Sequence, residues 1–262
     1  MFDPYTIIPQ PSVGVLYEPS ALAAARLEGT TAVVIDAIRA STTIVMALAA
    51  GVAEVIPYLT AEEVLAEEAR RPEDAVVTAG ERKGVRIEGL DLNNSPAAMT
   101  PETIGAKTLL LTTTNGTVAI LGAMRAETVL VAALPNRRAV ARAVIERGRR
   151  VVFVPAGTVG TVSCEDILVA GAVIEALGEE PGGERFHLED SARLALAAWR
   201  GARPHLAELF HQTWGGSFLV SLEMEEDLAV CVQVDSVEVV PVVRGEPPVI
   251  TAFRRPPRRP RS

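Results

Sequence analysis

The sequence is poor in cysteine and aromatic residues and has no long apolar run. Of its 262 residues two are cysteine, and 4% are aromatic. Cys164 and Cys231 stand far apart and do not form the disulfide framework of a small secreted domain. No run approaches the roughly 18 apolar residues that span a bilayer, and the first residues lack the basic start of a signal peptide. We therefore expect a cytoplasmic protein without a membrane partner.

Positive charge is also scarce over most of the chain. Against 33 acidic residues there are 25 basic ones, which gives a formal net charge of −8. This balance argues against nucleic acid as a partner. The exception is the end of the sequence, FRRPPRRPRS, where proline and arginine predict a disordered basic tail over 251–262. A solvated tail is favoured over a tethering role.

Short apolar runs rich in β-branched residues alternate with stretches of helical spacing. This alternation predicts an α/β fold with a mixed, largely parallel sheet flanked by helices. The predicted strands are 32–37, 53–58, 75–80, 108–113, 128–133 and 150–157. The predicted helices between them are 41–50, 61–70, 117–125, 136–147 and 164–177.

The pattern changes after about residue 180. Residues 189–201 and 203–213 have helical spacing, whereas 228–235 and 237–243 are predicted as strands. The segments 33–51, 109–124 and 151–174 share one design, an apolar strand, a polar loop and then a helix that starts with small residues.

This recurrence suggests two related subdomains, with no sharp linker between them. We place an N-terminal α/β subdomain at 1–130 and a C-terminal one at 131–250.

The segment LLLTTTNGTVAIL (109–121) raises the first question of function. A buried strand should end here in small polar residues before a helix begins. In parallel sheets, ligands bind beyond the carboxyl ends of strands, where helix N-termini attract anions. Thr114, Asn115 and Gly116 are therefore candidate substrate-binding residues. The alternative is that this loop only caps the helix, since it lacks the GKS/T ending of a phosphate-binding P-loop.

An acid and an arginine follow the strand predicted at 32–37. Asp36 closes this strand, Arg39 follows, and Thr42 lies at the start of the next helix. Arginine binds oxyanions through two parallel hydrogen bonds, so this pair suits an anion or metal–phosphate site. A plain surface ion pair is the alternative.

The longest polar stretch in the middle of the chain is AGERKGVRIEGLDLNNSP (79–96). Its glycines and mixed charges, which include Glu81 and Arg82, fit either a solvated loop or a lid over a site. Ser95 and Pro96 predict a helix start.

Adjacent acids occur in SCEDILVAG, at the start of the helix predicted from 164. Ser163 and Asp166 fit a capping box. The functional alternative is that Glu165 and Asp166 are Mg²⁺ ligands beside a phosphate site. Cys164 as a nucleophile is less favoured, because no catalytic cysteine loop accompanies it.

Three further features are interpreted as structural. The histidines lack metal-ligand spacing, and Trp199 and Trp214 are expected to pack. Asp227 is expected to cap a helix, with a contribution to a site as the alternative.

Taken together and in order, four motifs resemble the 2-phosphosulfolactate phosphatases. They are VVIDAIRASTTIVMAL, GERKGVRIEGLDLNNSP, TTTNGT and AGTVGTVSCEDILVAG, and they span residues 33–171. The resemblance implies a Mg²⁺-dependent acid phosphatase of coenzyme M biosynthesis, which converts (2R)-2-phospho-3-sulfolactate and water into (2R)-3-sulfolactate and phosphate. It also implies an α/β fold distinct from the common phosphatase folds.

Such a small, anionic, phosphorylated substrate gives the candidate residues roles. Glu165 and Asp166 would hold Mg²⁺ with Glu81 nearby, and Asp36 would act as nucleophile or as the base that orients water. Arg39 and the 113–117 loop would clamp the phosphoryl group. The substrate-binding candidates are Thr42, Arg82, Asn94, Ser95, Thr114, Asn115 and Gly116.

Two alternatives stay open: a phosphatase for another small phosphorylated hydroxy acid, and a non-catalytic anion-binding protein. A homodimer also remains open.

Overall fold

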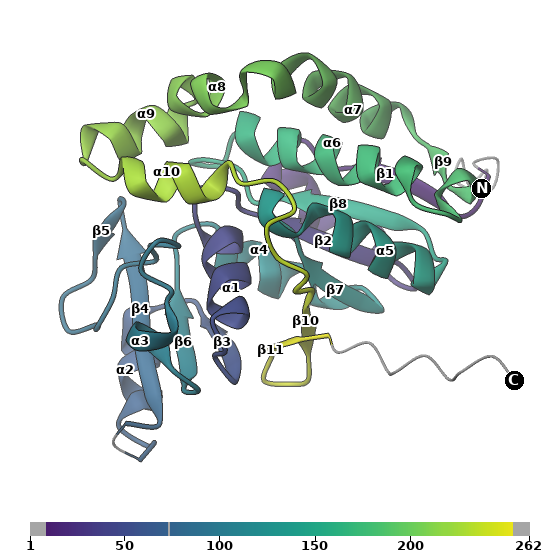
Figure 1. Ribbon diagram of the computed structural model, residues 1–262. Coiled ribbons are helices and arrows are strands. Elements are labelled where there is room, and N and C mark those ends of the chain that lie inside the picture. Colours follow the sequence, from purple (N-terminus) through teal and green to yellow (C-terminus); the bar gives the residue numbers. More distant parts are fainter. Residues whose placement is uncertain (1–8, 73, 254–262) are drawn as a thin grey trace, which may run out of the picture.

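One continuous sheet runs through the computed structural model, which describes residues 9–72 and 74–253 (Figure 1). Within these residues the sheet has eleven strands, in the order β5-β4-β6-β3-β11-β10-β7-β2-β8-β1-β9. The strands are β1 (Ser12–Val15), β2 (Thr31–Ile35), β3 (Glu54–Tyr58), β4 (Val76–Arg82), β5 (Val85–Arg86), β6 (Thr108–Thr112), β7 (Thr128–Val131), β8 (Val151–Pro155), β9 (His187–Leu188), β10 (Pro241–Arg244) and β11 (Val249–Ala252).

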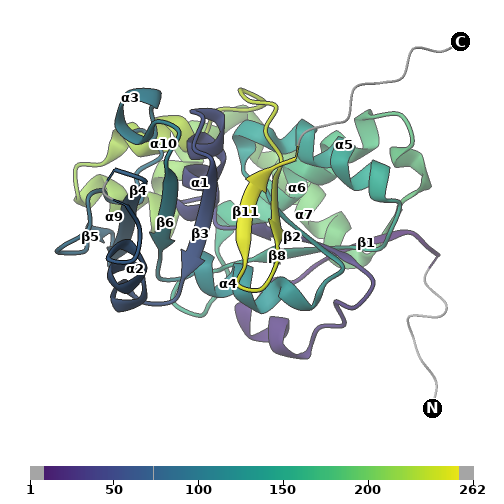
Figure 2. The same ribbon diagram turned by 90° about the horizontal axis from the view of Figure 1, so that it is seen from below.

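Two groups of parallel strands lie on either side of an antiparallel hairpin. Strands β4, β6 and β3 form one parallel group. Strands β7, β2, β8, β1 and β9 form the other. The hairpin of β10 and β11 pairs with β7 on one side and with β3 on the other (Figure 2). Late residues of the chain therefore join two groups of earlier strands.

Helices cover both faces of this sheet. In Figure 1, α5 and α6 lie on one face with α7 outside α6, whereas α1 and α4 lie on the other face. Among the described residues the helices are α1 (Ala40–Ala49), α2 (Ala61–Glu68), α3 (Pro101–Ile104), α4 (Gly116–Gly122), α5 (Arg137–Arg147), α6 (Cys164–Glu179), α7 (Asp190–Ala202), α8 (Leu206–Gln212), α9 (Trp214–Ser221) and α10 (Glu225–Cys231).

Strand β2 illustrates why its residues are almost all apolar. Val33 and Ile35 pack in the cluster with α5 and α6, while Ala32 and Val34 pack with α1 and α4. Because side chains alternate along a strand, a strand with helices on both faces needs apolar residues at every position. Each fully buried Val or Ile side chain contributes about 1.5–3 kcal/mol to stability.

The chain crosses between the two strand groups through α1 and α4. Helix α1 leads from β2 to β3, and α4 leads back from β6 to β7. Both helices follow the carboxyl end of a strand. This crossing brings the polar loops before α1 and α4 together.

The predicted fold class is confirmed, and the six predicted strands and the helices between them are present. The strand predicted at 228–235 is wrong, because residues 225–231 form α10. Three acids in its first turn favour a helix start, and Leu228 and Cys231 are buried at helical spacing.

The helix start predicted at Ser95 and Pro96 is also wrong. Ser95 Oγ accepts a hydrogen bond from the Ala98 amide, but the turn ends there. The next helix, α3, begins at Pro101 with Thr100 as its cap.

The division near residue 130 stays a prediction, since the one sheet takes strands from both sides of that position. Of the predicted basic tail, residues 254–262 lie outside the described residues. Within the described part of the chain, none of the helices is both long and apolar enough to cross a membrane.

Candidate active site

The starts of α1 and α4 lie in close contact. A Cβ atom on Gly116, the first residue of α4, would lie 2.7 Å from Asp36 Oδ2 and 2.5 Å from Ala40 Cβ. Real Cβ atoms do not approach so closely, so only glycine fits at this position without displacing its neighbours. The glycine of the TTTNGT loop therefore lets α4 begin directly beside the acid that follows β2.

The polar residues of this loop divide between two roles. Thr113 Oγ1 accepts a hydrogen bond from the Thr117 amide at 3.1 Å, and Thr117 Oγ1 donates to the Thr113 carbonyl at 2.9 Å. These two buried threonines stabilise the helix start. Thr114 and Asn115 instead line a cavity. The structural interpretation therefore describes Thr113 and Thr117, and substrate binding by Thr114 and Asn115 stays a prediction.

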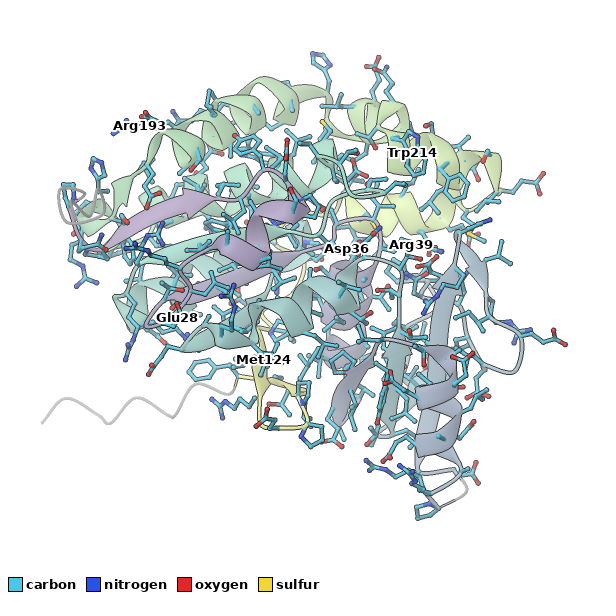
Figure 3. All side chains as sticks on the ribbon, turned by 180° about the vertical axis from the view of Figure 1, so that it is seen from behind. Glu28, Asp36, Arg39, Met124, Arg193 and Trp214 are labelled. Atoms are coloured by element: carbon cyan, nitrogen blue, oxygen red, sulfur yellow. The ribbon has the colours of Figure 1, made fainter. Side chains whose placement is uncertain are left out.

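This cavity has a volume of ≈ 790 Å³ and lies at the carboxyl ends of β2, β4 and β6. Figure 3 shows two of its lining residues, Asp36 and Arg39, beside each other near Trp214 of α9. Seven of the predicted site residues line it: Asp36, Arg39, Glu81, Arg82, Asn94, Thr114 and Asn115.

The other five predicted site residues surround this cavity without lining it. Gly116 contacts Asp36, as described above. Thr42 is fully buried, and its hydroxyl donates to the Ala37 carbonyl at 2.8 Å. Ser95 donates a hydrogen bond to Asp227. Glu165 and Asp166 are buried in the first turn of α6.

Asp166 connects the loops that follow β2 and β8. Its Oδ1 accepts a hydrogen bond from the Ala37 amide at 2.8 Å, and its Oδ2 accepts one from the Gly157 amide at 3.0 Å. The side chain is buried, and Ser163 Oγ accepts from the Asp166 amide, which caps α6. Asp166 therefore fixes the backbone directly after Asp36.

Glu81 connects the β4–β5 hairpin to the threonine loop in the same way. Its Oε1 accepts a hydrogen bond from the Thr114 amide, and its Oε2 accepts one from the Gly84 amide, each at 2.8 Å. Glu81 is buried and lines the cavity. Asp166 and Glu81 thus position four loops around one space.

Burial raises the pKa values of three acids here, and repulsion by neighbouring acids adds to it for Asp36 and Asp166. Burial, with smaller contributions from Glu81 and Glu165, raises the pKa of Asp36 to about 7. Burial and the charge of Asp36 raise the pKa of Asp166 well above its usual range. Burial also raises the pKa of Glu165, against hydrogen bonds that include one with Thr213. Among the described residues, none of these acids forms an ion pair within 4.0 Å.

Arg39 forms an ion pair with Asp227 and not with Asp36, the acid three residues before it. Its Nη1 lies 2.6 Å from Asp227 Oδ2, and its Nη2 donates to the Gly84 carbonyl at 3.0 Å. Both side chains of this ion pair are at most 4% exposed. Arg39 therefore joins α1 to α10 and to the β4–β5 hairpin, so its charge is already neutralised beside the cavity.

For two residues near the cavity, the structure differs from the interpretation favoured from the sequence. For Asp227 capping was favoured over a contribution to a site, yet its carboxylate accepts hydrogen bonds from Arg39 and Ser95. Trp214 was expected to pack, but it is 60% exposed and lines the cavity. Three consecutive acids start α10, and the sequence does not indicate which of them points inward.

Cys164 does not lie among the residues that line the cavity. Burial raises the pKa of its thiol, which disfavours the thiolate that a nucleophile requires. Trp199 does pack as predicted, since it is buried and donates to Glu175 at 2.7 Å.

The acids suit a divalent cation that is bound partly by protein carboxylates and partly by water and substrate oxygens. Within the described residues, no three His, Cys, Asp or Glu side chains converge as a metal-binding group. Mg²⁺, however, commonly uses one or two carboxylates and completes its shell with water and phosphate oxygens. Uncompensated acids with raised pKa values supply the negative charge that such an ion neutralises. Asn94 adds a buried Oδ1 that lacks a hydrogen-bond partner among the described residues.

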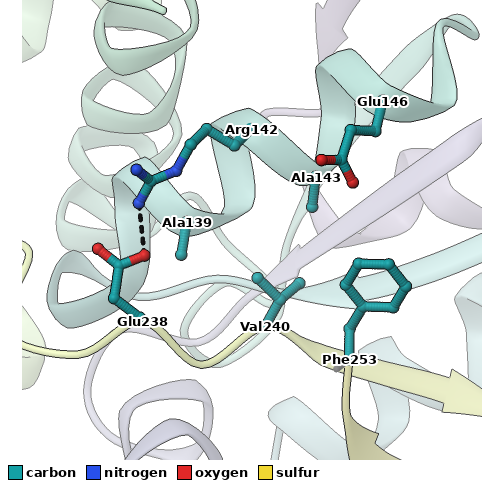
Figure 4. Close-up of a pocket in the computed structure, with 7 residues that line it drawn as sticks. All are labelled: Ala139, Arg142, Ala143, Glu146, Glu238, Val240 and Phe253. Carbon is teal, nitrogen blue, oxygen red and sulfur yellow. Dashed lines mark hydrogen bonds and ion pairs between the residues drawn. The ribbon is translucent and has the colours of Figure 1, made fainter. Parts of the chain in front are cut away.

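A second, smaller cavity lies between α5 and β10 (Figure 4). Its polar side chains include Arg142 and Glu238, which form an ion pair with each other. The guanidinium carbon of Arg147 lies over the ring of Phe253, 5.2 Å from the centre of the ring. This arrangement leaves fewer polar groups for a ligand than the cavity beside Asp36.

The comparisons with known proteins identify the class to which this fold and site belong. Residues 17–246 match the family model described as 2-phosphosulpholactate phosphatase. The chain therefore belongs to the 2-phosphosulfolactate phosphatase family, which confirms the resemblance of its motifs. The predicted enzyme class, phosphoric monoester hydrolase, is the class to which the names of its relatives refer.

Three curated relatives are named "Probable 2-phosphosulfolactate phosphatase". The protein from Symbiobacterium thermophilum is 38% identical over 220 residues, 84% of this chain and 93% of its own length. The one from Cyanothece sp. is 37% identical over 84% of this chain and 91% of its own length. The one from Clostridium botulinum (strain Eklund 17B) is 35% identical over 82% and 89%, respectively.

Proposed function

We propose that this chain is a Mg²⁺-dependent phosphomonoester hydrolase that converts (2R)-2-phospho-3-sulfolactate and water into (2R)-3-sulfolactate and phosphate, a step of coenzyme M biosynthesis. The observation that carries the proposal is the group of buried acids without an ion-pair partner at the cavity, within the described residues. Acids repel a phosphate unless a cation lies between them. An acid-rich phosphate site is therefore best explained by a metal ion. The names of the relatives support the substrate.

Asp36 and Glu165 would hold the ion, because both carboxyl groups are buried and neither has an ion-pair partner among the described residues. Burial raises the pKa values of both, and a bound cation would offset that cost of their charge. When bound, Mg²⁺ would neutralise charge on the phosphoryl oxygens and lower the pKa of bound water. Asp166 would orient the Asp36 turn through its hydrogen bond to the Ala37 amide.

The remaining lining residues would position the ester. Thr114 and Asn115 offer side-chain donors next to the start of α4, and Glu81 fixes the Thr114 amide. Asp36 would act either as the nucleophile on phosphorus or as the base that orients the attacking water. As a nucleophile, Asp36 would form an acyl phosphate while the bond between phosphorus and the ester oxygen breaks, and water would then hydrolyse this acyl phosphate. As a base, it would take a proton from the attacking water. In both cases the ester oxygen leaves as the alcohol, and phosphate is the other product.

The test is phosphate release from racemic 2-phosphosulfolactate, measured with Mg²⁺ and with EDTA at mildly acid and neutral pH. We expect release with Mg²⁺ only, which stops near half conversion because one enantiomer is used. Release from phospholactate or phosphoglycerate alone would keep the chemistry and reject the named substrate. Absence of release from every ester would favour the non-catalytic anion-binding alternative.

A further inference from the structure

The turn between β4 and β5 places a lysine, Lys83, at the cavity of the candidate active site. Arg82 of β4 pairs with Val85 of β5, so Lys83 and Gly84 form a two-residue turn. Both have a positive φ, 53° and 73°, as a type I′ hairpin turn requires. The first position of such a turn favours Asn, Asp or Gly. The geometry of the turn therefore does not account for a lysine here.

Contacts on several sides hold this turn close to the acids of the site. The Gly84 amide donates to Glu81 Oε2 at 2.8 Å, and the Gly84 carbonyl accepts from Arg39 Nη2 at 3.0 Å. A Cβ atom on Gly84 would lie 2.7 Å from Leu222 Cδ1, so the turn packs directly against the residue that follows α9 (Figure 1). The backbone that carries Lys83 is therefore fixed at the cavity.

Three cationic side chains among the described residues line this cavity, Arg39, Arg82 and Lys83, and their partners differ. Arg39 is neutralised by Asp227 at 2.6 Å. Arg82 already donates to two backbone carbonyls, at 2.7 and 2.9 Å, and to Thr112 Oγ1 at 3.1 Å. Lys83 is exposed and has neither a hydrogen bond nor an ion pair with any described residue. Its ammonium group is free to bind a ligand.

The charges of the proposed substrate call for such a group. In the proposed function, Mg²⁺ lies between buried carboxylates and the phosphate, and its charge does not neutralise all of them. The centre therefore repels a further anion. The substrate carboxylate is attached to the carbon that bears the phosphate, whereas a methylene group separates the sulfonate from that carbon. The sulfonate thus extends further from the metal, and it stays ionised at every pH at which the protein is folded.

We propose that Lys83 binds the sulfonate of the substrate and thereby makes the site select the trianionic ester over phosphate esters that lack a sulfonate. This inference rests on the proposed phosphomonoester hydrolase function and adds a specificity-determining residue to it. The lysine ammonium is a compact charge with three donors on a flexible stem, which suits the tetrahedral oxygens of a sulfonate. Because Lys83 would contact neither the metal nor the phosphorus, it should act on binding and not on the chemical step.

Binding of matched phosphonates tests the inference without hydrolysis. In 3-sulfopropylphosphonate a C–P bond replaces the ester and the spacing between phosphorus and sulfur is kept, whereas propylphosphonate lacks only the sulfonate. We would measure both Kd values by calorimetry with Mg²⁺ present. The sulfonate should tighten binding by about 5–50-fold in the unchanged protein, and Lys83→Met should abolish this ratio. An equal ratio in both proteins would overturn the inference.

The other lysine of the chain, Lys107, provides the matched control. It precedes β6, at the end of that strand opposite the cavity, and pairs with Asp74 at 3.7 Å. Lys107→Met removes the same charge and should leave both Kd values unchanged. Lys83→Arg should keep most of the sulfonate preference, because the positive charge remains. If Arg82→Met abolishes the preference and Lys83→Met does not, the sulfonate is bound elsewhere and the inference fails.

Chemical modification gives a second readout that does not depend on activity. Since the chain has two lysines, acetylation of each can be followed by mass spectrometry of its peptides. With Mg²⁺ present, 3-sulfopropylphosphonate should slow the acetylation of Lys83 and leave that of Lys107 unchanged. Equal protection of Lys83 by propylphosphonate at the same occupancy would show that Lys83 does not recognise the sulfonate, and would overturn the inference.

Hydrolysis separates this inference from the proposed function. For Lys83→Met we expect KM for 2-phosphosulfolactate to rise by about 5–50-fold at unchanged kcat, and KM for 2-phospholactate, which lacks the sulfonate, to stay the same. Hydrolysis with the same KM in both proteins would keep the hydrolase and reject the role of Lys83. Sulfonate binding that depends on Lys83, without hydrolysis of any ester, would support that role and reject the hydrolase.

Discussion

In its first turn, helix α6 buries Glu165 and Asp166, and ten residues further along it buries Glu175. These acids are 3%, 2% and 8% exposed, so desolvation acts on all three. Their surroundings differ. Glu175 accepts from Trp199 at 2.7 Å, from Arg203 at 2.9 Å and from Arg200 at 3.2 Å.

The pKa values of the two groups consequently shift in opposite directions. Burial alone would raise the pKa of Glu175, but hydrogen bonds from Trp199 and Arg200 and the charge of Arg203 outweigh it and lower the pKa. At the first turn, burial raises the pKa values of Glu165 and Asp166, and the charges of Asp36 and Glu165 raise that of Asp166 further. The fold supplies cations to the structural acid and withholds them from the acids beside the cavity. That contrast distinguishes the candidate site better than burial does.

The largest effect should follow from a change at Asp36, which repels the first-turn acids. Asp36→Asn keeps the size of the side chain and removes its charge, so phosphate release should fall at least about 10³-fold while the fold is retained. Steady-state phosphate release measures the loss, and circular dichroism controls for folding. Activity within about tenfold of the unchanged protein would exclude Asp36 from the reaction.

A pH dependence should follow next. Between the ordinary pKa of 3.8 and the raised value of about 7, folded Asp36 keeps a proton that the unfolded chain has lost. The free energy of unfolding should therefore fall as pH rises through this range, by roughly 4 kcal/mol at most. We expect a lower Tm at pH 8 than at pH 5 in EDTA, and a larger stabilisation by Mg²⁺ at pH 8.

The control for this pH experiment is the Asp36→Asn variant. Its Tm should change less between pH 5 and pH 8, since the asparagine side chain does not titrate. An identical pH profile in both proteins would assign the dependence to other groups.

The same substitution at the two ends of α6 should then separate activity from structure. Glu165→Gln should lower phosphate release by about 10–100-fold, because a metal ligand or its support is lost. Glu175→Gln should leave kcat unchanged at 25 °C. Equal losses in both variants would contradict the functional difference between the two ends.

Stability should respond in the reverse order, with the smallest effect of the series. Glu175→Gln leaves Arg200 and Arg203 without their buried partner, so the free energy of unfolding should fall by about 1–3 kcal/mol. Glu165→Gln should leave it unchanged or raise it at pH 8, since a buried charge is removed. Urea unfolding of both variants measures the difference, and greater destabilisation by Glu165→Gln would refute it.

Much of the fold could be predicted from local patterns. The unbroken apolar run of β2 and the helical spacing in α1 reflect contacts that each element makes with the core, and these leave a local record in the sequence. The prediction of a strand at 228–235 was wrong because a short apolar run fits a strand or a helix equally well. Their helix depends on packing beside α8 and α9.

The candidate site was predictable where polar residues follow strands. Asp36, Glu81 and Asn115 are found in this way, because strand ends in a parallel sheet share one edge. The positions of Asp227 and Trp214 were not, since Trp214 lines the cavity from α9 and Asp227 contacts Arg39 from α10, both after long stretches of chain. No local pattern records that Arg39 pairs with a residue 188 positions away.

By itself, the sequence determined the α/β class, the order of strands and helices along the chain, the polar loops at strand ends and the family. Only the tertiary structure decided the order of strands across the sheet, the ion pair that occupies Arg39 and the acids left without a cation. The physical reason is the separation along the chain over which each kind of interaction acts. Periodicity and capping act over a few residues, whereas pKa values and cavities depend on groups that only folding brings together.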